Sequence, residues 1–336
     1  MACESQIFSL SGPSFLTAVD WNNSGHRRSV AASLVQGVYT LENDRRQNRQ
    51  ALAPPWWHSF NFRLVQILVD NHDVSHFGAV FEFLNHLSGS GAGPPQYVIA
   101  FRGTIPKPGN REEDFKLDLH LLINDLQKSS RFQMGLETAC QIVQHAGPAK
   151  VWLAGHSLGS SLALVVGREM AKTMGLHLET YLFNPPFIAP PIERLANEKL
   201  KLGLRFANSL VTAGLAAATR RNDGRETEPF ALLCAWVPYL FINTADPICS
   251  EYVGYFKHRE DMESIGAGKI GRLATKHSIG SVLSSAVGKE REPLHLIPSA
   301  YLTLNLTPPS NFREAHGICQ WWAHDLLLDY KYYQHK

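Results

Sequence analysis

The sequence has few cysteines and little net charge. Its 336 residues include 5 cysteines, and no two of them stand as Cys-x-x-Cys, so neither a zinc site nor a disulfide framework is expected. Lysine and arginine number 32 and aspartate and glutamate 30, which gives a formal net charge of +2. This balance favours no general attraction to nucleic acid, and the basic residues 26–28 are interpreted as part of a solvated face. With 44% hydrophobic residues, the composition is that of a globular protein.

Long hydrophobic runs and targeting signals are also lacking. Residues 1–10 do not combine a basic start with an apolar stretch, so no signal peptide is expected. The second residue is alanine rather than glycine, and residues 333–336 form no prenylation box. The longest uncharged apolar run, 229–245, is too short to span a bilayer and contains Pro238. We therefore expect no transmembrane segment and a cytoplasmic location.

The sequence does contain short apolar runs that alternate with helical patterns. The runs are rich in β-branched, aromatic and leucine residues and end at turn residues, which is typical of strands. They are 62–69, 77–83, 97–101, 151–154, 180–183, 239–242 and 301–306. Between the middle runs, 131–145 and 160–174 carry apolar residues at helical spacing. The alternation predicts an α/β fold with a mostly parallel sheet covered on both faces, and the first two runs predict an antiparallel hairpin at one edge.

The connection between the fifth and sixth runs is long for a crossover. Residues 192–229 carry several leucines and then the polar stretch 220–225. We expect one domain over residues 1–336, with 192–229 inserted as a helical cap over a site. The alternative is an ordinary helix of the layer followed by a surface loop.

Residues 155–159 read Gly-His-Ser-Leu-Gly, which matches the Gly-x-Ser-x-Gly pattern of a nucleophile elbow. Chance alone produces this pattern in roughly one chain in ten of this length. Here a predicted strand precedes it and a predicted helix follows it, as the elbow requires. Larger side chains at Gly155 and Gly159 would collide with neighbouring backbone. We therefore predict Ser157 as the nucleophile and the amide of Leu158 as an oxyanion donor at the helix N-terminus.

A serine hydroxyl needs a base, and the base needs a carboxylate that orients it. With this type of elbow, the acid and then the histidine follow the serine along the chain. Asp246 stands in a Thr-Ala-Asp-Pro turn directly after the run 239–242 and is the predicted acid. Asp223 and Asp261 follow no strand and are less suitable.

The base is expected between the last strand and the last helix. The run 301–306 is the last predicted strand, and residues 317–328 are the last predicted helix. This order favours His316 as the base. His295 precedes the strand and is the next candidate, whereas His324 falls inside the predicted helix.

A second oxyanion donor is expected in the loop after an earlier strand. The run 97–101 leads into Arg102, Gly103 and Thr104. Gly103 permits a tight turn, and Thr104 offers both an amide and a hydroxyl, so Thr104 is the candidate. For Arg102 we favour a structural ion pair at the edge of the sheet.

One literal Gly-x-Gly-x-x-Gly stands at residues 266–271. It follows a polar stretch rather than a strand, so it does not indicate a dinucleotide site. Ile270 also stands where a P-loop needs serine or threonine. We expect no cofactor and no metal.

These motifs resemble the class 3 (fungal-type) lipases of the α/β-hydrolase fold, and more closely a plant subfamily of lipase-like proteins. The resemblance covers nearly the whole chain and rests on segments that include Phe-Arg-Gly-Thr at 101–104, Trp-Leu-Ala-Gly-His-Ser-Leu-Gly at 152–159, Asn-Thr-Ala-Asp-Pro at 243–247 and Glu-Ala-His-Gly at 314–317. It implies an α/β-hydrolase with Ser157, Asp246 and His316 as nucleophile, acid and base. It also implies Thr104 and Leu158 as oxyanion donors. Some members carry the label GDSL esterase/lipase, but Gly-Asp-Ser-Leu does not occur here.

The sequence departs from class 3 lipases in one place. Those lipases usually have an apolar, amphipathic lid after the oxyanion strand, whereas residues 107–116 are polar and charged. A small, soluble ester is therefore at least as suitable a substrate as a fat droplet.

The leading hypothesis is a serine-dependent carboxylic ester hydrolase that acts on a small-molecule ester or lipid without a cofactor. One alternative is a non-catalytic lipid- or acyl-binding protein with the same fold. Another is an acyltransferase that uses the same three residues. The sequence sets no oligomeric state.

Overall fold

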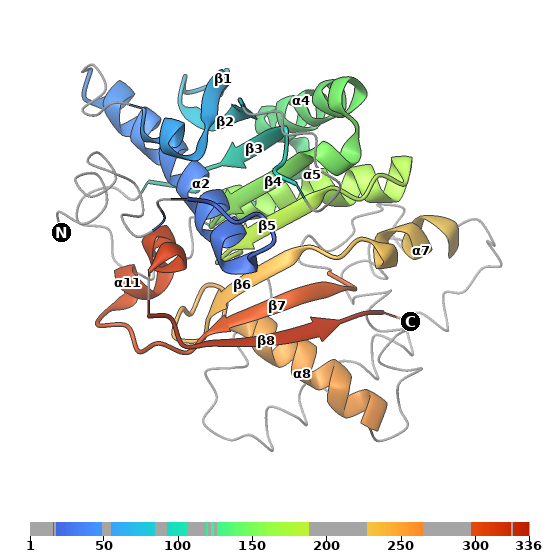
Figure 1. The fold of residues 1–336 in the computed structure, drawn as a ribbon. Coiled ribbons are helices and arrows are strands. Elements are labelled where there is room, and N and C mark those ends of the chain that lie inside the picture. The colour runs from blue at the N-terminus through green and yellow to red at the C-terminus, as the bar shows by residue number, and fades with distance from the viewer. Residues whose placement is uncertain are drawn as a thin grey trace.

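A computed structural model of the chain describes residues 16, 18–48, 55–84, 93–105, 119, 122–123, 126–187, 227–264, 297–323 and 325–335. These residues form one eight-stranded sheet in the order β1-β2-β3-β4-β5-β6-β7-β8, so each strand lies beside its neighbour in the sequence (Figure 1). The candidate cap at 192–229 lies outside the described residues, except that its last three residues begin helix α7 (Thr227–Ala235).

The sheet is mixed and mostly parallel. Its strands are β1 (Phe62–Val69), β2 (His76–Phe83), β3 (Tyr97–Phe101), β4 (Val151–His156), β5 (Glu179–Phe183), β6 (Tyr239–Asn243), β7 (Ala300–Asn305) and β8 (Leu328–Tyr333). β1, β2 and β3 pair antiparallel, β3 to β7 pair parallel, and β8 pairs antiparallel with β7. The α/β class and the antiparallel hairpin at one edge, both expected from the sequence, are confirmed.

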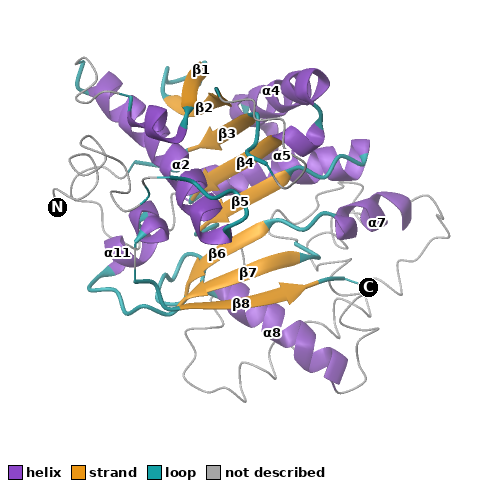
Figure 2. Cartoon of the chain, viewed as in Figure 1, coloured by secondary structure: helices purple, strands orange, loops and turns teal. Residues whose placement is uncertain are grey.

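Helices cover both faces of this sheet (Figure 2). One face carries α2 (Ser24–Arg46), the short helix α11 (Phe312–His316) and the 3₁₀ turns η1 (Trp56–Phe60) and η5 (Ile318–Trp322). The other face carries α4 (Ser130–Ala146), α5 (Leu158–Met174) and α8 (Glu251–Ser264). Short 3₁₀ turns also lie at η2 (Leu126–Lys128) and η3 (Pro148–Lys150). In the described part of the chain, no helix has the length and apolar character needed to cross a membrane.

The two faces of β3 show why the strands read as continuous apolar runs. Val98 and Ala100 are fully buried in the core on the α2 side. Ile99 and Phe101 are fully buried in the core on the α5 side. Because successive side chains of a strand point to opposite faces, a strand covered on both sides has no polar face.

The C-terminal region differs from the expectation. Residues 317–328 were expected to be helical, but the structure has the five-residue turn η5 followed by the strand β8. Ile318, Trp321 and Trp322 are buried, and their spacing of three and four residues imitates a helical face. β8 is an edge strand whose middle residues are exposed, so it lacks the apolar run by which the other strands were recognised.

The solvated face expected at residues 26–28 is wrong for Arg28. This side chain is buried on α2, and its Nε donates to the carbonyl oxygen of Trp321 at 2.8 Å. Its neighbour Arg27 pairs with Glu179 and lies 5.2 Å from the ring centroid of Trp152. The basic cluster therefore fastens α2 to β4, β5 and the C-terminal region.

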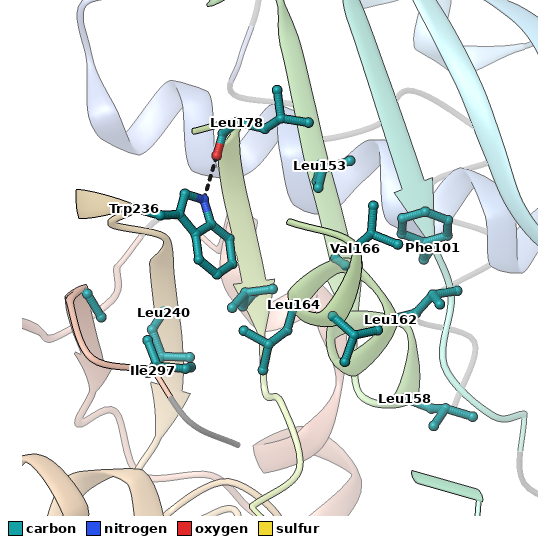
Figure 3. Packing of buried hydrophobic residues seen from close by; sticks show 14 of the residues in the cluster. Phe101, Leu153, Leu158, Leu162, Leu164, Val166, Leu178, Trp236, Leu240 and Ile297 are labelled. Carbon is teal, nitrogen blue, oxygen red and sulfur yellow. Dashed lines mark hydrogen bonds between the residues drawn. The ribbon is translucent and has the colours of Figure 1, made fainter. Parts of the chain in front are cut away.

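The core on the α5 side includes a large indole that follows α7 (Figure 3). Trp236 is nearly fully buried, and its Nε1 donates to the carbonyl oxygen of Leu178 at 2.9 Å. A Cβ at Gly167 of α5 would lie only 2.5 Å from Cζ2 of this ring. The absence of a side chain at Gly167 is thus what lets the indole reach α5.

Replacing Trp236 tests how much its indole contributes to the free energy of unfolding. Trp236→Ala removes a buried ring and leaves the Leu178 carbonyl without its donor, so we expect the free energy of unfolding to fall by ~3–5 kcal/mol. Urea unfolding at pH 7 measures it. Trp236→Phe fills much of the same space and should cost clearly less, so equal losses for the two variants would contradict this packing argument.

Candidate active site

The Gly-His-Ser-Leu-Gly segment forms the junction between β4 and α5. Ser157 has φ 55° and ψ −126°, a positive-φ conformation that is rare for a residue with a side chain. Its amide donates to the carbonyl of Phe183 at 3.0 Å, and its carbonyl accepts from the amide of Ser160 at 2.9 Å. The turn is thereby held by β5 on one side and by the first turn of α5 on the other.

Glycine is required on both sides of this turn. A Cβ at Gly155 would lie 2.2 Å from the carbonyl oxygen of Gly159. A Cβ at Gly159 would lie 2.3 Å from the carbonyl oxygen of Phe101. Both contacts are with backbone, which cannot rotate away as a side chain can. The collision expected from the sequence is therefore present at both positions.

The three residues singled out for the reaction lie in one hydrogen-bonded row. His316 Nε2 is 3.0 Å from Ser157 Oγ, and His316 Nδ1 is 2.8 Å from Asp246 Oδ2. All three are buried. Ser157 follows β4, Asp246 follows β6, and His316 is the last residue of α11. The alternatives His295 and His324 lie outside the described residues.

Asp246 is surrounded by donors. Its Oδ2 accepts from Asn184 Nδ2 at 2.7 Å and from Cys249 Sγ at 3.2 Å, and its Oδ1 accepts from the amide of Ile248 at 3.0 Å. Burial alone would raise the pKa of Asp246, but the His316 imidazole and these hydrogen bonds together lower it below its ordinary value. The carboxylate is therefore charged beside the imidazole at neutral pH.

Sequence reasoning missed Asn184, which connects three parts of the site. Besides Asp246, its Nδ2 contacts the carbonyl oxygen of Ala315 at 3.2 Å, and its Oδ1 accepts from Trp321 Nε1 at 2.6 Å. The residue has φ 45°, so the backbone also has a special conformation here. The available signal was its place directly after the predicted strand 180–183, because the carboxyl ends of parallel strands gather at one edge.

The loop after β3 lies against the nucleophile. A Cβ at Gly103 would be 2.7 Å from Ser157 Cβ, so the residue directly before the partly buried Thr104 lies against the serine. Leu158 is the first residue of α5, and its amide belongs to the helical turn whose amides have no intrahelical acceptor. The two expected oxyanion donors thus stand on separate segments, one residue after Gly103 and one residue after Ser157.

Arg102 has the structural role expected for it. Its side chain is buried, with Nη2 3.7 Å from Glu42 Oε1 on α2 and Nε donating to the carbonyl of His76 at 2.6 Å. Burial would raise the pKa of Glu42, but hydrogen bonds from Arg45, Arg46 and the His76 amide, with the charge of Arg102, lower it to about 2. Arg102 therefore ties β3 to α2 through a charged carboxylate.

This arrangement can activate a hydroxyl group. An imidazole nitrogen 3.0 Å from a serine oxygen can take its proton during attack on a carbonyl carbon. The carboxylate on the other nitrogen fixes the tautomer and stabilises the imidazolium that forms.

Comparison with known proteins gives one informative match. No family model matches the chain, and no solved structure matches it. An Arabidopsis thaliana protein named GDSL esterase/lipase is 44% identical over an alignment 354 positions long, which covers 100% of both chains.

The backbone contact at Gly159 predicts a large effect from a single methyl group. In Gly159→Ala the new Cβ meets two carbonyl oxygens, of Phe101 at 2.3 Å and of Arg102 at 2.5 Å, so β3 and α5 must move apart. We expect a loss of roughly 3 kcal/mol or more in unfolding free energy, measured with urea.

Gly135→Ala in α4 is the matched control. There the new Cβ would meet Phe101 Cζ at 3.4 Å, an ordinary contact, and alanine favours a helix. This variant should be about as stable as the wild type or more so. Similar losses at residues 135 and 159 would argue against the close backbone packing.

Asn184→Asp predicts a pH-dependent loss of stability. The change puts a second carboxyl group where Nδ2 lies 2.7 Å from Asp246 Oδ2, so one of the two pKa values must rise above the ordinary range. A carboxyl group with a raised pKa in the folded state stabilises below its unfolded pKa and loses that contribution as the pH rises through the folded value. The free energy of unfolding of Asn184→Asp should therefore fall below that of the wild type, and the difference should grow from pH 4 to pH 8, where it reaches about 2 kcal/mol or more.

Urea unfolding across that pH range measures the gap. Asn48→Asp is the control, because Asn48 has the same φ of 45° but is exposed. The free energy of unfolding of Asn48→Asp should differ little from that of the wild type, and the difference should be nearly independent of pH. A gap for Asn184→Asp that stays constant with pH would refute the carboxylate contact.

Proposed function

The chain belongs to the same esterase/lipase family as the Arabidopsis protein, and we propose that it is a carboxylic ester hydrolase with Ser157, Asp246 and His316 as its catalytic triad. The observation that supports this most directly is the hydrogen-bonded row from Ser157 Oγ through the imidazole to Asp246 Oδ2, with distances of 3.0 and 2.8 Å. The chain order of the three residues agrees with it.

In the first half of the proposed reaction, Ser157 Oγ attacks the ester carbonyl carbon while His316 Nε2 takes the hydroxyl proton. The carbonyl oxygen becomes an oxyanion, which the amides of Thr104 and Leu158 stabilise. Collapse of this intermediate breaks the ester bond, and the protonated Nε2 gives its proton to the leaving alcohol. The product at this stage is an acyl group on Ser157.

The second half releases the acyl group. Water takes the position of the alcohol, His316 Nε2 removes its proton, and the oxygen attacks the acyl carbon. Ser157 leaves with the proton from Nε2, and a free carboxylic acid is formed. Throughout, the charged Asp246 holds Nδ1–H of the ring and stabilises the imidazolium.

We also propose that the chain is class 3 lipase-like within this family. The serine lies in a Gly-His-Ser-Leu-Gly elbow, whereas the tetrapeptide that the letters GDSL spell is absent from the sequence. The polar and charged sequence of residues 107–116 supports a short or soluble ester rather than a fat droplet as substrate. The residues themselves lie outside the described part of the chain.

Labelling and turnover test the proposed triad. A fluorophosphonate probe should label the wild-type protein at Ser157, and esters of short acyl chains should be hydrolysed. Ser157→Ala should abolish labelling and lower kcat/KM on the order of 10⁴- to 10⁶-fold, because the reaction loses its nucleophile. Ser161→Ala, four residues further along α5, is the control and should retain both.

The same assay separates the alternatives. Hydrolysis gives a free carboxylic acid without any added acceptor. A product that forms only with an added alcohol would indicate acyl transfer, and binding of acyl esters without turnover would indicate a binding protein. Labelling that persists in Ser157→Ala would remove the proposed nucleophile.

A further inference from the structure

The histidine next to the nucleophile is fully enclosed. His156 Nδ1 is 2.8 Å from the Tyr39 hydroxyl on α2, and its Nε2 is 2.7 Å from the backbone carbonyl oxygen of His316. Burial, and then the proximity of the His316 ring, lowers the pKa of His156 to about 3. This imidazole is therefore neutral at neutral pH, with one nitrogen protonated and the other not.

The direction of each hydrogen bond in this group follows from the chemistry. A carbonyl oxygen only accepts, so Nε2 of His156 carries the proton and donates to His316. Nδ1 then has a lone pair and accepts the hydroxyl proton of Tyr39. The same hydroxyl oxygen accepts from the amide of Gly103 at 2.7 Å. These three hydrogen bonds form a relay in which each group donates to the next. It runs from the Gly103 amide through the Tyr39 hydroxyl and the His156 ring to the His316 carbonyl oxygen.

Helix α2 holds the amide of Gly103 directly, through Tyr39, and its carbonyl indirectly, through Arg102 and Glu42. Tyr39 accepts from its amide, and Arg102 Nη1 donates to its carbonyl oxygen at 2.6 Å. Arg102 is in turn paired with Glu42, which lies three residues after Tyr39 on the same helix. One face of α2 thus determines where the loop after β3 lies.

This loop has no room to shift towards the serine. A Cβ at Gly103 would lie 2.7 Å from both Ser157 Cβ and the Tyr39 hydroxyl oxygen. The Tyr39 hydroxyl and Ser157 Cβ therefore both lie against Gly103 on the side where a side chain would project, and only glycine fits between them and the loop. A change in the position of the hydroxyl changes the position of the loop that carries Thr104.

We propose that Tyr39 is a positioning residue of the active site. Its hydroxyl fixes the Gly103–Thr104 segment over Ser157 and, through His156, fixes the backbone of the base His316. This inference rests on the proposed ester hydrolase function, in which Thr104 donates to the oxyanion and His316 moves the proton. The amide of Gly103 is committed to Tyr39, which leaves the oxyanion to the amides of Thr104 and Leu158.

Tyr39→Phe tests the proposal by removing one oxygen atom. The relay loses its central member, so the donors to the oxyanion shift while substrate contacts stay. We expect kcat to fall on the order of 10- to 100-fold while KM changes by less than about twofold. Inhibition by a trifluoromethyl ketone, which forms an oxyanion on Ser157, should weaken by the same factor as kcat/KM.

Tyr97→Phe is the matched control. Tyr97 begins the strand β3, at the end opposite Gly103, and its hydroxyl donates to Glu82 at 3.0 Å. The same atom is deleted from a tyrosine that lies away from the site, so the kinetic constants should equal those of the wild type. A Tyr39→Phe variant with kcat within twofold of the wild type would overturn the proposal.

Hydrogen exchange gives a readout that does not need turnover. The Gly103 amide should exchange faster in Tyr39→Phe than in the wild type and should be unchanged in Tyr97→Phe. Exchange at Gly103 that is the same in all three proteins would overturn the proposed contact. If the Gly103 amide exchanges faster in Tyr39→Phe but kcat is unaltered, the Tyr39 hydroxyl has only a structural role, and this result would also overturn its positioning role.

His156→Asn provides a second variant if Tyr39→Phe folds poorly. The asparagine side chain keeps an acceptor near Nδ1 for Tyr39 but has no donor that reaches His316. We expect a loss in kcat with normal exchange at Gly103, and normal kcat would contradict the relay. Failure of the proposed function is distinguishable from all of these variant results. In that case the wild-type protein itself neither hydrolyses esters nor reacts with the fluorophosphonate at Ser157.

Discussion

The site depends on three places where one backbone touches another with no side chain between them. Gly155 lies against Gly159, Gly159 lies against the end of β3, and Gly103 lies against the carbonyl oxygen of His156. These contacts bring β3, β4 and the start of α5 closer together than any residue with a Cβ would allow. Ser157 keeps its positive φ because the surrounding packing prevents the turn from adopting another backbone conformation. The backbone strain is confined to this turn, which is held in place by hydrogen bonds to β5 and to the first turn of α5.

The parallel register of the sheet converts this turn into a site. Ser157, Asn184 and Asp246 come shortly after the ends of β4, β5 and β6, and the strands are in register at those ends. The amide of Ser157 bonds to the last residue of β5, and the amide of Asn184 bonds to Phe241 of β6. Parallel strands thus bring Ser157, Asn184 and Asp246 to one edge of the sheet, where the His316 side chain from α11 contacts Ser157 and Asp246.

The sequence predicted the parts of this structure that depend on local pattern. All seven apolar runs are strands; those in the middle of the sheet are buried on both faces, whereas the run 62–69 forms the partly exposed edge strand β1. The glycine spacing at 155–159 is dictated by backbone contact. β8 was missed because an exposed edge strand has no continuous apolar run. His316 was chosen as the residue before a helix, whereas it is the last residue of α11. Asn184 and Tyr39 were missed because their partners lie 62 and 117 residues away, beyond any local pattern.

The contact between Arg28 and the Trp321 carbonyl joins the two ends of the chain beside the site. During synthesis the ribosome releases α2, the elbow and the acid long before η5 and β8. A nascent chain that stops before residue 316 has the serine, its glycines and the carboxylate, but it has neither the imidazole nor the acceptor for Arg28. The proposed triad is therefore complete only once the segment that carries His316 and Trp321 has docked onto α2.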